Sequence, residues 1–136
     1  MMDETGKKKE EFPEEVWRRF LRLTLGGQPY TITVPIVEGE DEEVCFRSPT
    51  NIQLKLLNKA ERMHPEILTE MRMHAYIKNL NDQERPFPAT VEDLRTQAES
   101  FYGSMDGALR ERLLRFQQGF VTILNRIVSE DFPPGF

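Results

Sequence analysis

Residues 108–128, ALRERLLRFQQGFVTILNRIV, form the stretch that most constrains how this chain can fold. Apolar side chains recur there at spacings of three and four, which is typical of an amphipathic helix. A second apolar line runs beside the first, and so wide an apolar arc needs neighbours on more than one side. We therefore expect this helix at the centre of a bundle. The first line consists of Leu109, Leu113, Phe116, Phe120, Leu124 and Ile127, and the second of Leu114, Val121 and Val128.

Gly119 interrupts this helix near its middle. A glycine inside a helix costs about 1 kcal/mol relative to alanine, so the position predicts a compensating close approach by a neighbouring helix or hairpin. The alternative is an exposed glycine on the polar face, beside Gln117 and Gln118. Gly119 also marks the edge of the apolar arc, where a partner helix could dock.

The first part of the chain is predicted to contain a small antiparallel β structure. Residues 12–25 begin like a helix, and alternation of leucines with polar residues predicts a change to strand near Phe20. The Gly-Gly pair that follows supplies the turn of a tight hairpin. Residues 30–37 alternate β-branched and polar side chains, which favours a strand. A third short strand is expected at residues 44–47.

Pro35 lies within residues 30–37 and has no N–H to donate to a neighbouring strand. We therefore expect that strand to lie at a sheet edge or to end there.

Helical spacing dominates the rest of the chain. It predicts a helix that starts at one of three candidate N-caps, Ser48, Thr50 or Asn51, and that Pro65 ends. Further helices are predicted over residues 65–80 and 91–105, with Thr90 capping the last. The predicted fold class is α+β: a small N-terminal antiparallel β-hairpin or meander packed on a bundle of about four helices, with the last helix central. The predicted organisation is a disordered polar tail (1–11), a single globular domain (12–130) and a Pro/Phe-rich C-terminal tail (131–136).

Composition limits the classes of partner. The formal net charge of −5 argues against nucleic acid as the main partner, since that binding depends on neutralising phosphates. No apolar run approaches the roughly 18 residues of a membrane span, so we expect no membrane partner. A single cysteine, Cys45, excludes an internal disulfide and favours an intracellular location, in cytoplasm or nucleus.

The densest group of potential metal ligands lies in residues 61–74. Glu61 and His64 have the Glu-x-x-His spacing of di-iron carboxylate bundles, and Glu70 precedes His74 by four residues. A di-iron site needs two such motifs on separate helices, and Pro65 breaks the helix between these pairs. We expect no metal and no cofactor, and a metal-dependent enzyme using these four residues remains an alternative hypothesis.

Arginines gather at two places. Arg18, Arg19 and Arg22 lie near two aromatic side chains, and four more arginines lie on the polar face of the last helix. These clusters support a second alternative, a nucleic-acid-binding protein. We favour a solvated face for the arginines of the last helix, and an amphipathic element with buried aromatic side chains for the first cluster. The candidate partner-binding residues are Trp17, Arg18, Arg22, Arg110, Arg112, Arg115, Gly119, Phe132 and Phe136, with Arg126 also on the basic face of the last helix.

No catalytic motif is recognisable in the sequence. We therefore expect a non-enzymatic protein–protein interaction module, an adaptor, regulatory or assembly protein, that acts through helical and strand-edge surfaces. Its partner would be another protein, and a homo-oligomer is included among the expected assemblies.

Overall fold

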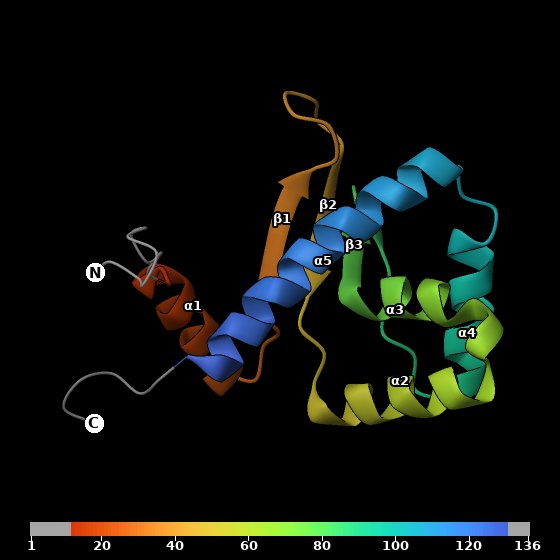
Figure 1. The fold of residues 1–136 in the computed structure, drawn as a ribbon, viewed down its shortest axis with the longest axis horizontal. Helices are drawn as coiled ribbons and strands as arrows, with labels where there is room; N and C mark the ends of the chain where they lie inside the picture. Colours follow the sequence, from red (N-terminus) through yellow and green to blue (C-terminus); the bar gives the residue numbers. More distant parts are fainter. Residues whose placement is uncertain (1–11, 131–136) are drawn as a thin grey trace, which may run out of the picture.

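The fold combines five α-helices with one four-stranded antiparallel sheet, which confirms the predicted α+β class. The computed structural model describes residues 12–130 of the chain. Figure 1 shows the longest helix, α5, lying obliquely across the sheet, with α2, α3 and α4 gathered at one end and α1 at the other. The elements in chain order are α1 (Glu14–Leu25), β1 (Thr31–Pro35), β2 (Glu43–Arg47), α2 (Asn51–Met63), a short 3-10 turn (Pro65–Ile67), α3 (Leu68–Tyr76), β3 (Ile77–Leu80), β4 (Gln83–Glu84), α4 (Val91–Tyr102) and α5 (Gly107–Ser129).

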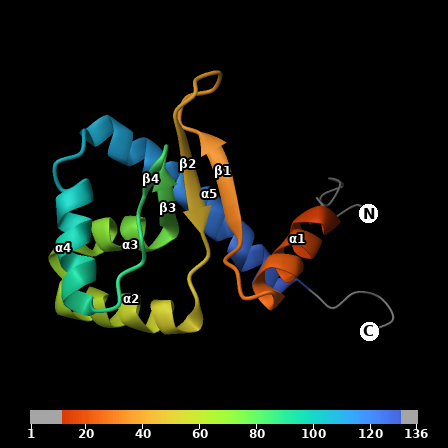
Figure 2. The same cartoon turned by 180° about the vertical axis from the view of Figure 1, so that it is seen from behind.

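The sheet has the strand order β1-β2-β3-β4, so β1 and β4 are its edges. Ile32 of β1 lies opposite Phe46 of β2, and Val44 of β2 lies opposite Leu80 of β3. Pro35 is the last residue of β1, as expected from its missing donor. Seen from behind in Figure 2, the strands lie in front of α5, which therefore covers the opposite face of the sheet.

The prediction that residues 12–25 change from helix to strand is wrong. The helix α1 continues to Leu25, and Gly27, at φ +80°, lies just beyond its end. A left-handed glycine after the last turn is a common way to end a helix. The Gly-Gly pair therefore ends a helix instead of turning a hairpin, and the actual hairpin connection between β1 and β2 is the acidic segment 36–42.

The predicted helix over residues 65–80 is also too long. It ends at Tyr76, and the next residues form β3, which pairs with β2. Ile77 is fully buried in the core cluster under α5, so tertiary pairing overrides the helical spacing here. Asn81 turns the chain into β4 with φ +52°, a conformation that asparagine tolerates better than most residues.

The helix α2 begins after Thr50, one of its three candidate caps, and α4 begins after its predicted cap Thr90. The Thr50 hydroxyl accepts a hydrogen bond from the Gln53 N–H, and the Gln53 side chain accepts one from the Thr50 N–H, a reciprocal capping box. Thr90 caps α4 by accepting from the Asp93 N–H at 3.1 Å. As predicted, the first of these helices ends just before Pro65, at Met63.

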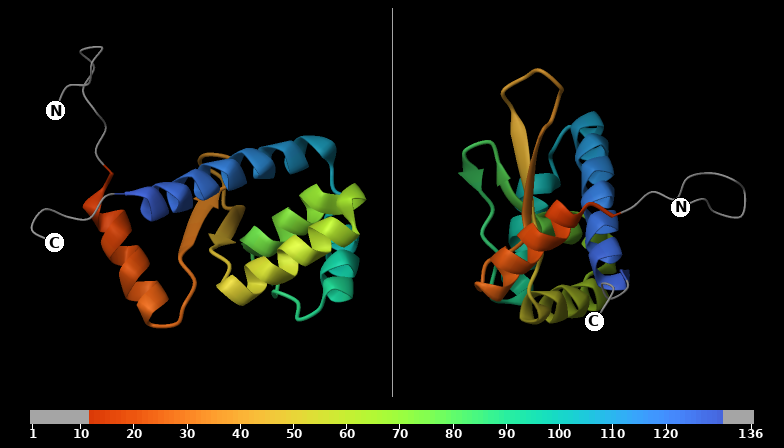
Figure 3. Two further views of the ribbon diagram at one scale, coloured as in Figure 1. Left: turned by 60° about the horizontal axis from the view of Figure 1, so that its bottom comes forward. Right: turned by 90° about the vertical axis from the view of Figure 1, so that its left-hand side faces the viewer.

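The core under α5 is rich in stacked aromatic rings. Phe120 of α5 stacks on Tyr30 and on Phe46, with ring centroids 6.1 and 5.7 Å away. Leu113 and Ile127, seven residues to either side of Phe120, are buried in the same cluster. A second cluster joins α2, α3 and α4, and Tyr76 packs against both clusters. Figure 3 shows α5 lying along one side of the molecule, with α1 turning away from it near the C-terminal end of α5.

The close approach predicted at Gly119 is wrong. Gly119 is exposed, and a Cβ placed on it would meet no atom within 4 Å. The open space belongs to a shallow hollow of about 250 Å³ between α5 and the first two strands, which Ile32 and Phe116 help to line. Gly119 is therefore exposed, as the alternative predicted, but it faces this mainly apolar hollow, and Gln117 beside it is buried.

Candidate binding groove

The second apolar line of α5 is only partly covered by neighbours. Leu114 and Val121 are only partly buried and line an open cavity, and Val128 is 84% exposed. We had expected neighbours on more than one side of this helix. The first line packs into the core, and Leu114 of the second line also packs against that core cluster. Leu114 and Val121 border the cavity and Val128 is exposed, so the second line is only partly covered by the described residues.

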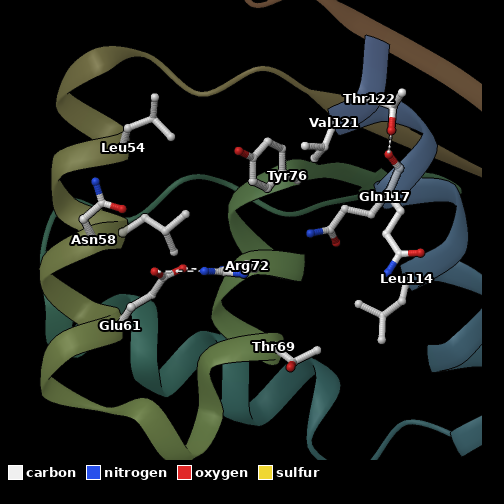
Figure 4. A pocket seen from close by; sticks show the side chains of 12 residues that line it. Leu54, Asn58, Glu61, Thr69, Arg72, Tyr76, Leu114, Gln117, Val121 and Thr122 are labelled. Atoms are coloured by element: carbon white, nitrogen blue, oxygen red, sulfur yellow. Dashed lines mark hydrogen bonds and ion pairs between the residues drawn. The ribbon is translucent and has the colours of Figure 1, made fainter. Parts of the chain in front are cut away.

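The space beside Leu114 and Val121 is a cavity of about 590 Å³ between α2, α3 and α5. Figure 4 shows side chains from α2 on one wall and from α5 on the other, with α3 at the back. Its lining mixes aliphatic with polar and charged groups. The lining residues are Leu54, Leu57, Asn58, Glu61, Thr69, Arg72, Tyr76, Leu114, Gln117, Gln118, Val121 and Thr122.

Gln117 is the most unusual residue of this lining. Its side chain is only 7% exposed, and its buried Oε1 has no hydrogen-bond partner. Figure 4 shows its amide directed from α5 toward the space between the helices. A buried acceptor without a donor costs about 1–3 kcal/mol, so the free protein holds a polar group that a bound donor would satisfy.

The opposite wall carries an ion pair. Arg72 of α3 donates from Nε to Glu61 Oε1 at 2.5 Å and from Nη2 to Glu61 Oε2 at 3.3 Å. The hydrogen bond to Glu61 raises the pKa of Arg72 above its ordinary value. Burial raises the pKa of Tyr76, which stands beside this pair and stays a neutral phenol at neutral pH. Glu61 and Arg72 thus neutralise each other on the cavity wall.

A second cavity, of about 800 Å³, adjoins the first. Leu54 and Tyr76 line both, and we call the two adjoining cavities together the α2–α5 groove. The second cavity is bounded by the ends of α1 and α5, the segment that leads into α2, and β3. Its lining residues are Phe20, Thr24, Gly27, Gln28, Pro29, Arg47, Ser48, Pro49, Thr50, Gln53, Leu54, Tyr76, Lys78, Phe87, Leu124, Asn125 and Val128.

Arg47 is the buried cation of this second cavity. It is 7% exposed and donates from Nε to the Ala75 carbonyl at 3.0 Å and from Nη2 to the His74 carbonyl at 2.8 Å. Its guanidinium also lies over the Phe87 ring, 5.3 Å from the centroid. Burial lowers the pKa of Arg47 to about 10, so the group is still a cation at neutral pH.

The four candidate metal ligands do not converge. Glu61 pairs with Arg72, Glu70 pairs with Arg110, and His64 lies near Glu66 and Glu92.

His74 is fully buried, with Nε2 lying 2.8 Å from Gln97 Oε1. Burial lowers the pKa of His74 to about 4, so the ring is neutral at physiological pH. Within residues 12–130, no three metal-ligating side chains come together in a way that could hold a metal ion.

The candidate arginines are spread over several contacts instead of forming one basic surface. Arg18 pairs with Glu14 at 2.8 Å, and Arg110 pairs with Glu70 at 3.0 Å. Arg112 donates to the Ile36 carbonyl.

The other candidates also lie apart from one another. Arg22 is exposed near the end of α1, Arg115 lines the hollow beside Gly119, and the Arg126 guanidinium lies 4.8 Å from the Phe12 ring centroid. Trp17 stacks on Phe20 with centroids 5.9 Å apart. Phe132 and Phe136, like the predicted tails 1–11 and 131–136, lie outside the described residues.

Sequence reasoning missed Arg47 and Gln117 as site residues. We had placed Gln117 on the polar face of the last helix, whereas it lies four residues after Leu113 and three before Phe120, both buried. That spacing places it inside the apolar stripe and was the available signal. No sequence signal marked Arg47 as a buried residue, because its burial depends on the carbonyls at the end of α3, which are distant in sequence.

No protein-family model, curated protein or solved structure matches this chain. None of the helices in the described part of the chain has the length and apolar character needed to cross a bilayer.

Proposed function

We propose that this protein is a non-enzymatic interaction module that binds an amphipathic helix of another protein in the α2–α5 groove. The observation that carries the proposal is the partly covered apolar line of α5, Leu114, Val121 and Val128, which borders the groove, with the unpaired Gln117 beside it. Exposed apolar surface rimmed by polar residues is typical of protein interaction sites.

The spacing of this line favours a helical partner. Its three residues are seven apart, which is the repeat by which one helix packs along another. The groove is bounded by two helices, α2 and α5, so an incoming helix would contact both. Docking an apolar helical face into such a groove is a recurrent mode of recognition.

Gln117 would fix the register of the bound helix. A single polar residue within an apolar helical seam selects the alignment in which it finds a hydrogen-bond partner. The partner helix would place a donor, such as an asparagine or glutamine amide, opposite Gln117 Oε1. Apolar contacts along the groove would supply the affinity, and this one pairing would supply the alignment.

A display library tests the proposal. The probe is a set of about 24-residue peptides with apolar residues at two positions of each heptad and random residues elsewhere. Selected peptides are expected to lose at least about tenfold in affinity toward Leu114→Glu and Val121→Glu, because a charge in the apolar seam is costly to bury. Val37→Glu is the matched control, since Val37 is 50% exposed and lines none of the groove.

Two results would overturn the proposal. One is a library that gives no binder to the folded protein. The other is a set of binders that ignore both groove substitutions while the variants keep their thermal unfolding midpoints.

A second copy of the chain is the other candidate occupant, and solution mass distinguishes it. Light scattering across concentration is expected to give a monomer if the partner is another protein. A dimer that Val121→Glu dissociates would reassign the groove to self-association.

A further inference from the structure

The second cavity of the groove has a charge pattern opposite to that of the whole chain. The chain carries 23 acidic and 18 basic residues. Yet, within residues 12–130, Arg47 and Lys78 are the charged residues that line this cavity, and no carboxylate of that range lines it. In an acidic protein, a cavity whose charged lining residues are cations favours a negatively charged group.

Arg47 has no acidic partner of its own in the described part of the chain. Its two hydrogen bonds go to main-chain carbonyls at the C-terminal end of α3. A helix end offers about half a negative charge at most, so these carbonyls only partly compensate a full positive charge. A buried cation normally finds a carboxylate or phosphate partner, and this one lines an open cavity.

Two neighbours add to the preference for an anion. Lys78 is exposed and lines the same cavity from β3. The capping residues Thr50 and Gln53 also line it, so the N-terminal end of α2 lies at the cavity. The N-terminal end of a helix carries partial positive charge and favours anions. Cations from two strands and one helix end therefore act on the same space.

The remaining lining residues indicate what kind of group would carry the negative charge into this cavity. Phe20, Leu54, Leu124 and Val128 supply an apolar wall. A small hydrated anion would leave this wall uncovered, whereas a charged side chain flanked by bulky apolar residues would satisfy both the wall and the cations. Such a sequence is what one end of an amphipathic helix presents.

We infer that this cavity receives a carboxylate side chain, Glu or Asp, from the helix bound in the α2–α5 groove, with Arg47 and Lys78 selecting it. The inference rests on the proposed function and adds an acidic requirement at the end of the bound helix that lies beside Val128. The first cavity, with its neutralised Glu61–Arg72 pair, imposes no such requirement.

The test uses the peptides selected from the display library. We expect enrichment of Glu or Asp at one position near one end of the selected helices. Replacing that residue by Gln or Asn is expected to weaken binding by about tenfold, the effect of losing a partly buried charge pair. Competition with millimolar acetate or inorganic phosphate leaves the binding nearly unchanged if the apolar flanks contribute as inferred.

Lys78→Gln reports on the cations without removing the buried Arg47. This substitution is expected to lower the affinity for the Glu-containing peptide by about threefold and to leave the affinity for its Gln-containing counterpart unchanged. Lys59→Gln is the matched control, because Lys59 is an exposed lysine of α2 that lines neither cavity.

The two proposals fail in different ways. Peptides that bind through Val121 but show no acidic enrichment, or the same affinity with Glu and Gln, overturn the carboxylate site and leave the helix groove intact. Equal effects of Lys78→Gln and Lys59→Gln also overturn it. Binding that ignores both Leu114→Glu and Val121→Glu overturns both proposals.

Discussion

Arg47 of β2 donates a hydrogen bond of 2.8 Å to the main-chain carbonyl of His74, in the last turn of α3. A second bond, of 3.0 Å, reaches the Ala75 carbonyl. The last carbonyls of a helix have no partner within the helix, so one buried side chain ties the end of α3 to the sheet.

Arg47→Gln is therefore expected to destabilise the fold. The shorter side chain would leave two buried carbonyls without donors, which should lower the free energy of unfolding by about 2–4 kcal/mol. Urea denaturation followed by circular dichroism measures the change. Arg22→Gln is the control, because Arg22 is exposed and should shift stability by less than about 0.5 kcal/mol. Equal stability of the two variants would contradict the role assigned to Arg47.

His74 is expected to make stability depend on pH. The unfolded chain binds a proton at the ordinary histidine pKa of 6.5, whereas burial lowers the pKa in the folded state to about 4. The contribution of His74 to the free energy of unfolding is therefore fully present above pH 6.5. It decreases as the pH falls from 6.5 toward 4 and does not change further below pH 4. The full loss is about 3 kcal/mol.

The difference in stability between the wild type and His74→Gln, measured by urea titration at each pH, isolates this contribution from the carboxylates. A difference that does not change between pH 7 and pH 4 would contradict the assignment.

Gly119→Ala is expected to stabilise the protein by about 0.5–1 kcal/mol. The position is helical and exposed, and an added Cβ meets no atom within 4 Å, so only the entropic cost of glycine is removed. Gly27→Ala is an informative comparison: its surroundings are equally open, but its φ of +80° strains an alanine. Thermal melts of the two variants should shift in opposite directions, and a destabilised Gly119→Ala would indicate a contact at that position.

Gln117→Leu is expected to separate stability from binding. Replacing an unpaired buried amide by an apolar side chain of similar size should raise the free energy of unfolding by about 1 kcal/mol. The same substitution should lower the affinity for selected helical peptides that carry a hydrogen-bond donor opposite Gln117. Gln118→Leu, at an exposed neighbouring position, should leave stability nearly unchanged. A destabilised Gln117→Leu would show that the amide is already satisfied in the free protein.

The parts of the fold that are visible in the sequence are those with local causes. The spacing of residues 108–128 predicted α5, and Pro65 predicted the break after α2. Thr90 marked the start of α4, and the start of α2 was narrowed to three candidate caps that include Thr50. The parts that were missed depend on distant contacts.

The strand β3 follows α3 directly, and nothing in IKNL outweighs the preceding helical spacing until β2 pairs with it. In α1, the leucine alternation that favours a strand gives way to the helix, which places Val16, Phe20 and Leu23 against the core.

The groove was only half visible in the sequence. The two apolar lines of the last helix predicted neighbours on two sides, but which line stays open depends on how α2 and α3 sit beside it. The metal hypothesis relied on spacing along the chain, and the folded chain directs Glu61, Glu70 and His74 to separate partners.

The two borders of the sheet restrict how copies of this molecule can join. At one border, Pro35 ends β1 without an N–H to offer. At the other, β4 is two exposed residues, Gln83 and Glu84, too short to template a further strand. Borders of this kind resist the strand-by-strand growth that leads to fibrils. At high concentration the protein should therefore stay free of cross-β aggregates for as long as its native sheet persists.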